Sequence, residues 1–327
     1  ETLVANAALL RRRIRDPKFS MELYGVGRRS RSDVVICYIS DSVDKSVLKR
    51  MRKLIQSIDV DALTMNIESL AECMFTHKWI NPFPKFKYSE RPDTATAAIL
   101  DGNIVIMVDN SPAVMIIPAS IFDIIEEADD FNFSPIIGSY LRITRFFFSI
   151  VTWILTPLWL LFVNNPDWVP EFLKFILITD DITVPVLLQL LILELAVDGL
   201  KLAAVNTPTM LSTPLSIVAG IVVGEYAVSS GWFNPEALLY MAVVTVGTYG
   251  QTNFEMGYAF KFLRVLMLIL TQIFNLAGFI TGVVISVLMI AFNRTITGKS
   301  YIYPLIPWDG KMLKRKVFRV RLPHGYK

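Results

Sequence analysis

The chain has 327 residues, of which 53% are hydrophobic and only 19% are charged, against roughly 25% charged residues in a typical soluble domain. Residues 1–140 contain 17 Lys and Arg against 19 Asp and Glu, whereas the 147 residues from Phe146 to Phe292 contain only 13 charged residues. Residues 294–327 contain nine basic residues and one acidic residue. This distribution excludes a single soluble globule and a disordered chain. It predicts a cytoplasmic α/β domain at 1–140, a transmembrane helical domain at 141–296 and a basic cytoplasmic tail at 297–327.

The residue inventory argues against catalysis and against metal binding. The chain has two cysteines and two histidines, too few for a Cys-based zinc site or a disulfide framework. The pair Gly25 and Gly27 lacks the third glycine of a dinucleotide-binding loop, and there is no P-loop or nucleophile elbow. The basic runs 11–15 and 28–31 are balanced by acids in the same domain, which argues against a nucleic-acid partner. We therefore expect no enzyme, no cofactor and no metal.

Residues 1–140 alternate between helical and extended patterns. The expected helices, one of them capped by Asp41 or Ser42, and the expected strands are, in chain order, helix 5–14, strand 33–39, helix 43–57, strand 61–65, helix 67–76 and a hairpin of strands 103–108 and 113–118. Strands interleaved with helices predict an α/β layer domain.

The first expected membrane span covers residues 143–163. Its 21 residues meet the length of about 20 apolar residues that a spanning helix needs. Arg142 and Arg145 at its start favour a cytoplasmic N-terminal domain.

The second expected span, residues 185–205, carries an intramembrane charge network of Glu194, Asp198 and Lys201. Their spacing of four and three residues places them on one helix face. A charge at the bilayer centre is unfavourable by roughly 2.5–3.5 kcal/mol, so these side chains must face protein or water. Two interpretations remain open: an ion pair such as Asp198 with Lys201 that locks the helix to a neighbour, or direct contact with permeating ions.

The third expected span, residues 210–229, is rich in small residues and contains Gly220 and Gly224. Five residues fall on one stripe and are candidate pore-lining residues: Leu211, Leu215, Val218, Val222 and Glu225. An apolar stripe that ends in an acid suits a hydrophobic constriction with an acidic ring. Simple packing in a helix bundle is the alternative.

The remaining apolar segments determine the expected topology. Residues 237–250 are short for a span and are interpreted as re-entrant or partial. Residues 262–292 are too long for one simple span, and we expect kinks at Gly278 and Gly282. Four full crossings place the N-terminal domain and the basic tail on the same side, although Lys261 and Arg264 then lie on the outer side. For the tail, binding to anionic lipid and packing on the acidic N-terminal domain are both open.

Several motifs together resemble the A subunits of the GerA family of spore germinant receptors. The motifs are Asn81-Pro82-Phe83-Pro84, Glu90-Arg91-Pro92-Asp93, Ile99-Leu100-Asp101-Gly102-Asn103, Val108-Asp109-Asn110-Ser111-Pro112, Glu194 with Asp198-Gly199, and the glycine-containing run 217–224. The tail motif Pro304-Leu305-Ile306-Pro307-Trp308 is most similar to one branch of the family. The family usually has Glu followed by Arg-Glu-Ala in the second span, whereas this chain has Glu194-Leu195-Ala196-Val197-Asp198.

The resemblance implies a multi-pass protein of the spore inner membrane that acts in germination. It implies a homo-oligomeric ring, a pentamer, around an ion-conducting pore, with other germination proteins and a small membrane partner nearby. Members of the family carry a further subdomain before the first helix, so we expect one to precede Glu1. The competing interpretation is a non-conducting scaffold or receptor subunit. A secondary transporter is less favoured, because no inverted repeat is visible.

Overall fold

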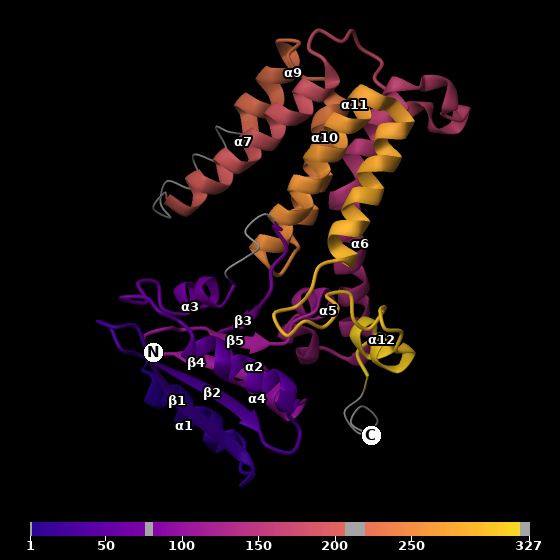
Figure 1. The fold of residues 1–327 in the computed structure, drawn as a ribbon. Coiled ribbons are helices and arrows are strands. Elements are labelled where there is room, and N and C mark those ends of the chain that lie inside the picture. The colour runs from indigo at the N-terminus through magenta and orange to yellow at the C-terminus, as the bar shows by residue number, and fades with distance from the viewer. Residues whose placement is uncertain (1, 76–80, 207–219, 321–327) are drawn as a thin grey trace. The chain divides into compact units, whose positions relative to one another are not determined.

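The computed structural model describes residues 2–75, 81–206 and 220–320, without the side chains of residues 205, 206 and 221–223. The chain forms two compact units. Unit 1 contains Glu1–Arg142 and Met289–Lys327, and unit 2 contains Ile143–Leu288. The C-terminal residues, which the charge distribution sets apart as a tail, therefore group with the N-terminal domain. Figure 1 shows the order of the elements along the chain.

The centre of unit 1 is a five-stranded antiparallel sheet of order β1-β2-β4-β5-β3. Its strands are β1 (Phe19–Val26), β2 (Ser32–Ile39), β3 (Lys87–Ser89), β4 (Ile104–Val108) and β5 (Val114–Ile117). The expected strand at 33–39 and the expected hairpin are confirmed. The expected strand at 61–65 is wrong, because Val60 and Asp61 use their carbonyls to accept hydrogen bonds from the backbone N–H groups of Arg28 and Arg29 in a turn.

Helices cover both faces of this sheet. They are α1 (Leu3–Arg13), α2 (Lys45–Gln56), α3 (Ile67–Met74) and α4 (Pro92–Leu100). On one face, α2 and α3 pack on Val34 and Ile36 of β2. On the other face, α1 and α4 pack on Val35 and Cys37. Both faces of the strand are buried, which explains why its sequence is a continuous apolar run rather than an alternating one. The predicted α/β domain is confirmed.

Helix α2 begins later than the sequence suggests. The carboxylate of Asp44, rather than Asp41 or Ser42, accepts hydrogen bonds from the backbone N–H groups of Ser46 (3.0 Å) and Val47 (3.5 Å). These N–H groups have no partner within the helix, so an N-cap carboxylate stabilises the first turn.

Residues near the C-terminus complete the core of unit 1. Ile296 is buried in the cluster formed by β2, α2 and α3. Tyr301 is fully buried, with its ring centroid 6.1 Å from that of Phe83. Its carbonyl accepts a hydrogen bond of 2.9 Å from the backbone of Ile121, at the start of α5 (Ile121–Ile125). The turn η1 (Ala128–Asn132) follows α5, and the last helix is α12 (Gly310–Val317).

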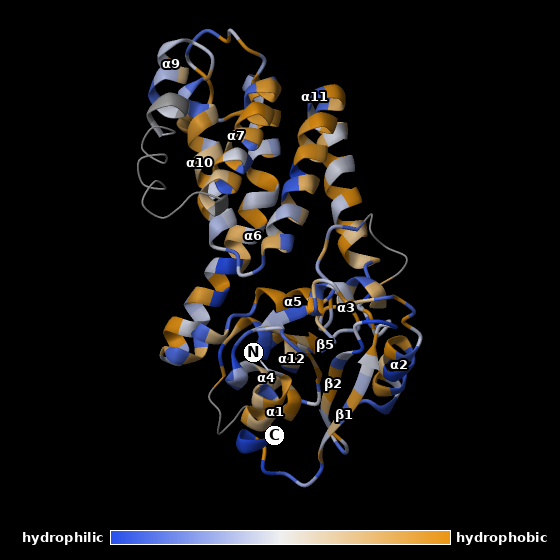
Figure 2. Cartoon of the chain, turned by 90° about the vertical axis from the view of Figure 1, so that its left-hand side faces the viewer, coloured by the Kyte–Doolittle hydropathy of each residue, from blue (hydrophilic) through white to orange (hydrophobic). Residues whose placement is uncertain are grey.

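Unit 2 is helical and largely apolar, and in Figure 2 its long helices are mainly orange, with white and blue turns among them. Its elements are most of α6 (Pro135–Asn164), the short turns η2 (Pro166–Trp168) and η3 (Glu171–Ile176), α7 (Val186–Asn206), the π-helix η4 (Ile221–Tyr226), α9 (Ala227–Ser229), α10 (Pro235–Tyr249) and most of α11 (Phe254–Ala291). Among the described residues, two helices are long and apolar enough to cross a membrane, α6 and α11, with mean hydropathies of 2.1 and 2.3.

Helix α11 is two helices joined at Asn275, whose backbone is non-helical with φ 52° and ψ −130°. A Cβ atom on Gly282 would lie 2.7 Å from Cγ of Met267, although a straight helix would separate these residues by about 22 Å at 1.5 Å per residue. The chain therefore reverses direction at Asn275. The expectation of kinks at Gly278 and Gly282 is wrong, because the helix is interrupted at Asn275. The two glycines instead allow residues 276–291 to pack closely on residues 254–274.

Candidate functional site

The charged residues of the expected intramembrane network converge in the interior of unit 2. Glu194, Asp198 and Lys201 lie on α7, and their spacing directs them to one side of that helix. Lys261 and Arg264 lie three residues apart on α11 and meet them. We call these five residues the charge cluster. The partners are 63 to 70 residues apart in the sequence, so only the tertiary fold brings them together.

Glu194 and Arg264 form the most buried ion pair of the cluster. Nε of Arg264 lies 2.5 Å from Oε1 of Glu194, and the side chains are only 3% and 4% exposed. Arg264 also donates a hydrogen bond to the carbonyl of Thr152 on α6. Partners on two helices satisfy the guanidinium, as a buried charge requires if its desolvation is to be offset.

Asp198 pairs with Lys261. The two side chains form an ion pair with exposures of 25% and 11%. Nζ of Lys261 also donates to the carbonyl of Glu194 at 3.0 Å and lies 3.6 Å from Oε2 of the same residue. The carboxylate of Asp198 therefore has a partner on another helix rather than the neighbouring Lys201 on its own helix.

Lys201 is the third cation of a cluster that contains only two carboxylates. Its Nζ atom lies 5.2 Å from the ring centroid of Tyr249 and 5.4 Å from that of Tyr258. Within the described part of the chain it forms no ion pair shorter than 4.0 Å. Three cations against two carboxylates leave the cluster with one excess positive charge, which the two aromatic faces partly compensate.

A cavity of about 50 Å³ adjoins the cluster, and its wall includes residues of the polar run 245–253, which begins in the last turns of α10 and continues beyond it. The hydroxyls of Thr245 and Thr248 donate to the carbonyls of Met241 and Val244 at 2.7 and 2.8 Å. They therefore offer only lone pairs to the cavity. Oε1 of Gln251 is buried without a hydrogen-bond partner among the described residues. The space is sufficient for water molecules, each of which needs at least about 10–15 Å³.

The structure describes only part of the candidate pore stripe. Leu211, Leu215 and Val218 lie outside the described residues. Val222 lies in the π-helix η4, where only its backbone is described, and Glu225 of the same element is exposed. In a π-helix the hydrogen bonds join residues five apart rather than four, so the face that residues 221–226 present differs from the face expected of an α-helix. Such irregular turns often occur at functional sites.

Within residues 2–75, 81–206 and 220–320, no group of three or more His, Cys, Asp or Glu side chains is arranged to hold a metal ion. The described residues around the cavity provide fixed charges, hydroxyls and an amide. Sequence reasoning placed Lys261 and Arg264 at an outer surface and did not include them in the network. The signal that links them to α7 is their spacing of three residues, which matches the spacing of Asp198 and Lys201 and the helical stripe that includes Glu194.

The fold thus combines an α/β unit with an apolar helical unit that contains buried charges. Residues 1–327 match the family model described as Bacillus/Clostridium GerA spore germination protein. The chain belongs to this GerA family of spore germination proteins. The resemblance drawn from the sequence motifs, including the tail motif typical of the stage V sporulation protein AF branch, is confirmed.

Two relatives indicate the extent of the similarity. The chain is 37% identical over 323 residues to stage V sporulation protein AF of Bacillus subtilis (strain 168), which covers 99% of this chain and 65% of that protein. It is 28% identical over 325 residues to spore germination protein GerLA of Bacillus cereus, which covers 98% of this chain and 65% of that protein. The chain therefore spans about 65% of the length of either relative.

Among solved structures, the chain is similar to the N-terminal domain of the A subunit of the Bacillus megaterium spore germinant receptor GerK3. The match is 32% identical in sequence, covers 35% of this chain and 90% of that chain, and has a TM-score of 0.28.

Proposed function

We propose that this chain is a subunit of a homo-oligomeric ion channel of the spore inner membrane that releases ions during germination. The observation that carries the proposal is the charge cluster and its polar cavity inside an apolar helical unit. Charged residues within membrane helices are rare because they are costly, and they mark ion or substrate pathways when they occur. Membership of a spore germination family gives the setting. The chain acts without enzymatic chemistry.

The pore in this proposal is formed by residues 210–229 of each subunit in a ring, a pentamer. Leu211, Leu215, Val218 and Val222 form apolar rings that exclude water when the channel is closed. Glu225 supports this arrangement because its side chain is exposed on the single chain. A carboxylate exposed on a membrane unit needs water or a partner, and the lumen of a ring supplies water.

The reversal of α11 at Asn275 changes the topology that we propose. Its two halves count as separate spans. Together with α6, α7, residues 210–229 and α10 they give six crossings in place of four, and α10, whose residues 237–250 were expected to be re-entrant or partial, is counted in this proposal as a short crossing of 15 residues. An even number of crossings keeps both parts of unit 1 in the cytoplasm. Arg142 and Arg145 favour the same side for the start of α6. With four crossings Lys261 and Arg264 would lie on the outer side. With six crossings they belong to a helix that begins on the cytoplasmic side. Partners in the membrane are other germination proteins, a small membrane protein and anionic lipid.

A non-conducting scaffold or receptor subunit is the second candidate, and one observation favours it. Glu194 and Asp198 both have cationic partners on another helix. Such a compensated arrangement is also what a purely structural lock between α7 and α11 requires. In that case the buried charges fix helix register and do not contact ions.

Ion flux from liposomes that contain the purified chain separates the two candidates. Glu225→Gln should reduce cation flux roughly tenfold or more, because a ring of like charges concentrates cations locally by 10 to 10³. Glu171→Gln, which removes a carboxylate that is 94% exposed on η3, is the matched control and should leave the flux unchanged. Val222→Ala should raise the resting leak, whereas Val243→Ala on α10 should not.

The scaffold interpretation is favoured instead if the folded, oligomeric protein conducts no more than empty liposomes. If the protein conducts but both Glu225→Gln and Val222→Ala behave as the wild type does, the pore follows another helix. The polar run 245–253 beside the cavity is then the next segment to test.

A further inference from the structure

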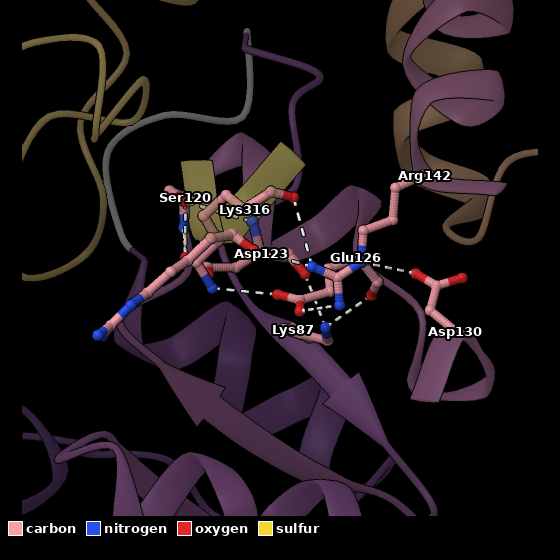
Figure 3. A network of polar contacts seen from close by, with 8 residues as sticks. Lys87, Ser120, Asp123, Glu126, Asp130, Arg142 and Lys316 are labelled. Carbon is pink, nitrogen blue, oxygen red and sulfur yellow. Dashed lines mark hydrogen bonds and ion pairs between the residues drawn. The ribbon is translucent and has the colours of Figure 1, made fainter. Parts of the chain in front are cut away.

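The C-terminal helix α12 is bound to α5 through a half-buried lysine, Lys316, whose side chain is 24% exposed. Nζ of Lys316 lies 2.5 Å from Oδ1 of Asp123 and 3.1 Å from Oε2 of Glu126. Figure 3 shows the lysine directed between the two carboxylates. Burial disfavours the charged lysine, but the attraction of Asp123 and Glu126 outweighs it and raises the pKa of Lys316. The pair therefore remains ionised.

Arg142 ties the start of α6 to the same group of residues. Its Nη2 atom lies 2.6 Å from Oε1 of Glu126, and its Nε atom lies 3.1 Å from Oδ2 of Asp130. Its Nη1 atom donates to the carbonyl of Arg315, on α12, at 3.1 Å. The Arg142 side chain is only 2% exposed. Glu126 is thus shared between a cation of α12 and a cation of α6, as Figure 3 shows.

Lys87 of β3 fixes the acidic end of this network. Its Nζ atom donates to the carbonyls of Asp123 and Glu126, both at 2.7 Å. These carbonyls lie at the C-terminal end of α5, where a cation is favoured by the helix dipole. With Lys87, Arg142 and Lys316 set against three carboxylates, the network is balanced in charge and rests on the sheet.

A second set of contacts extends the attachment of the C-terminal segment to α6. The backbone N–H of Arg319 donates to Oγ of Ser139 at 3.0 Å, and its Nη2 atom donates to the carbonyl of Phe131 at 3.0 Å. The guanidinium groups of Arg319 and Arg142 lie 5.5 and 5.1 Å from the ring centroid of Phe131. Ser139 and Arg142 are one turn apart on α6, so residues 309–320 hold the first turns of that helix.

Helix α6 is continuous from Pro135 to Asn164 and passes from unit 1 into unit 2 at Arg142. We propose that residues 309–320 form a latch, the C-terminal latch, that binds the root of α6 to α5, and that its release changes the conformation of α6 and thereby controls the membrane unit. The latch consists of contacts within one chain. Its partner surface is the acidic pair Asp123 and Glu126.

Hydrogen exchange of the full-length protein in detergent tests the latch. Lys316→Met removes the charge that α12 contributes to the network and retains the length of the side chain. The amides of α12 should then exchange at least about tenfold faster, because Asp123 loses this cation and Glu126 retains Arg142 but loses Lys316. The amides of residues 136–142 should exchange faster as well. Lys314→Met is the matched control, because Lys314 lies on the same helix and is exposed, and it should exchange as the wild type does.

Asp123→Asn tests the same contact from the other side without altering α12, and should reproduce the effect if Lys316→Met fails to fold. Unchanged exchange of α12 in both variants overturns the latch. Faster exchange of α12 with no change at residues 136–142 overturns the coupling to α6.

Ion flux is the second measurement, and it rests on the proposed function. In liposomes, Lys316→Met should change the flux relative to the wild type and to Lys314→Met, and equal flux with a released α12 overturns the control of the membrane unit. If the wild type conducts no ions, the proposed function fails, while the exchange experiment still decides whether the latch holds α6.

Discussion

Arg264 and Glu194 form an ion pair of 2.5 Å between α11 and α7, with both side chains less than 5% exposed. Because neither side chain is exposed to solvent, each charge is compensated by its partner in the protein and not by water. Glu194→Gln or Arg264→Met alone should lower the free energy of unfolding by about 3–5 kcal/mol, because a buried charge loses its partner. The double variant should be less destabilised than the sum of the two single variants.

Thermal unfolding in detergent measures these differences. Lys174→Met is the control, since its partner Glu171 is 94% exposed and the pair is 3.6 Å long; a surface change of this kind alters stability by no more than about 0.5 kcal/mol. Additive single and double effects would show that Glu194 and Arg264 do not act as a pair.

The two lysines of the charge cluster should behave differently. Lys261→Met leaves Asp198 without its partner and should destabilise unit 2 by about 3–5 kcal/mol. Lys201→Met removes the contacts with Tyr249 and Tyr258, worth about 0.5–2 kcal/mol, and among the described residues it breaks no ion pair shorter than 4.0 Å. Unfolding midpoints of the two variants, compared at one detergent concentration, give the order. The reverse order would mean that Lys201 is the partner of Asp198 in the membrane.

We expect substitution by alanine to have opposite effects at two glycines, one in the reversal of α11 and one on α7. A Cβ atom on Gly278 would lie 1.8 Å from the carbonyl oxygen of Leu270, whereas nothing lies within 4 Å of one on Gly199 of α7. Gly278→Ala should therefore destabilise the protein by about 1–3 kcal/mol or more through overpacking. Gly199→Ala should stabilise it by about 0.4–1 kcal/mol, since alanine loses less backbone freedom on folding. A neutral Gly278→Ala would exclude the close packing of the two halves of α11.

The stability of unit 1 should depend on pH through Glu22. A hydrogen bond from Arg52, opposed by burial and aided by Tyr38, lowers the pKa of Glu22 from 4.5 to about 2. A carboxyl whose pKa falls on folding contributes stability that is complete above its unfolded pKa and is lost as the pH falls through its folded pKa. The contribution of Glu22 should therefore disappear between about pH 4.5 and pH 2.

Hydrogen exchange of the backbone amides of β1 and β2, corrected for the intrinsic exchange rates, measures this loss of stability. Glu22→Gln should flatten the pH dependence in that window, and Glu68→Gln, an exposed carboxyl on α3, should not. Identical profiles for the wild type and Glu22→Gln would assign the acid sensitivity to another group.

Much of unit 1 is predictable from the sequence because its signals are local. The apolar run of β2, the turn at Asp109 and Asn110, and the helical spacing of Val47, Leu48 and Met51 each identify one element. Strand β1 is absent from the expected elements, although its polar and apolar residues alternate from Phe19 to Tyr24 as in a half-buried strand. What the sequence does not show is the partner of Glu22, because Arg52 reaches this carboxylate only after folding.

In the candidate site, too, the local pattern is predictable and the distant partners are not. Helical spacing correctly places the charges of α7 on one face, but it does not identify what faces them. Lys261 and Arg264 lie 63 to 70 residues away. Whether Lys201 or Lys261 pairs with Asp198 depends on how the helices of unit 2 are arranged. The reversal at Asn275 is equally hidden, because a single asparagine in an apolar run does not show where the chain turns, and the close packing depends on Gly278 and Gly282 across the turn.

Burial of Ile296 and Tyr301 in unit 1 has a consequence for biosynthesis. A ribosome makes the sheet and its helices first and the apolar helices of unit 2 next, and only then releases the residues that fill the remaining space in the sheet domain. The domain that is translated first is therefore finished last. Until residues 289–320 emerge, the surface around Phe83 and the carboxylates of α5 stays open, and we expect a ribosome-bound chain arrested at residue 290 to be cleaved by protease within unit 1 at sites that the completed chain protects.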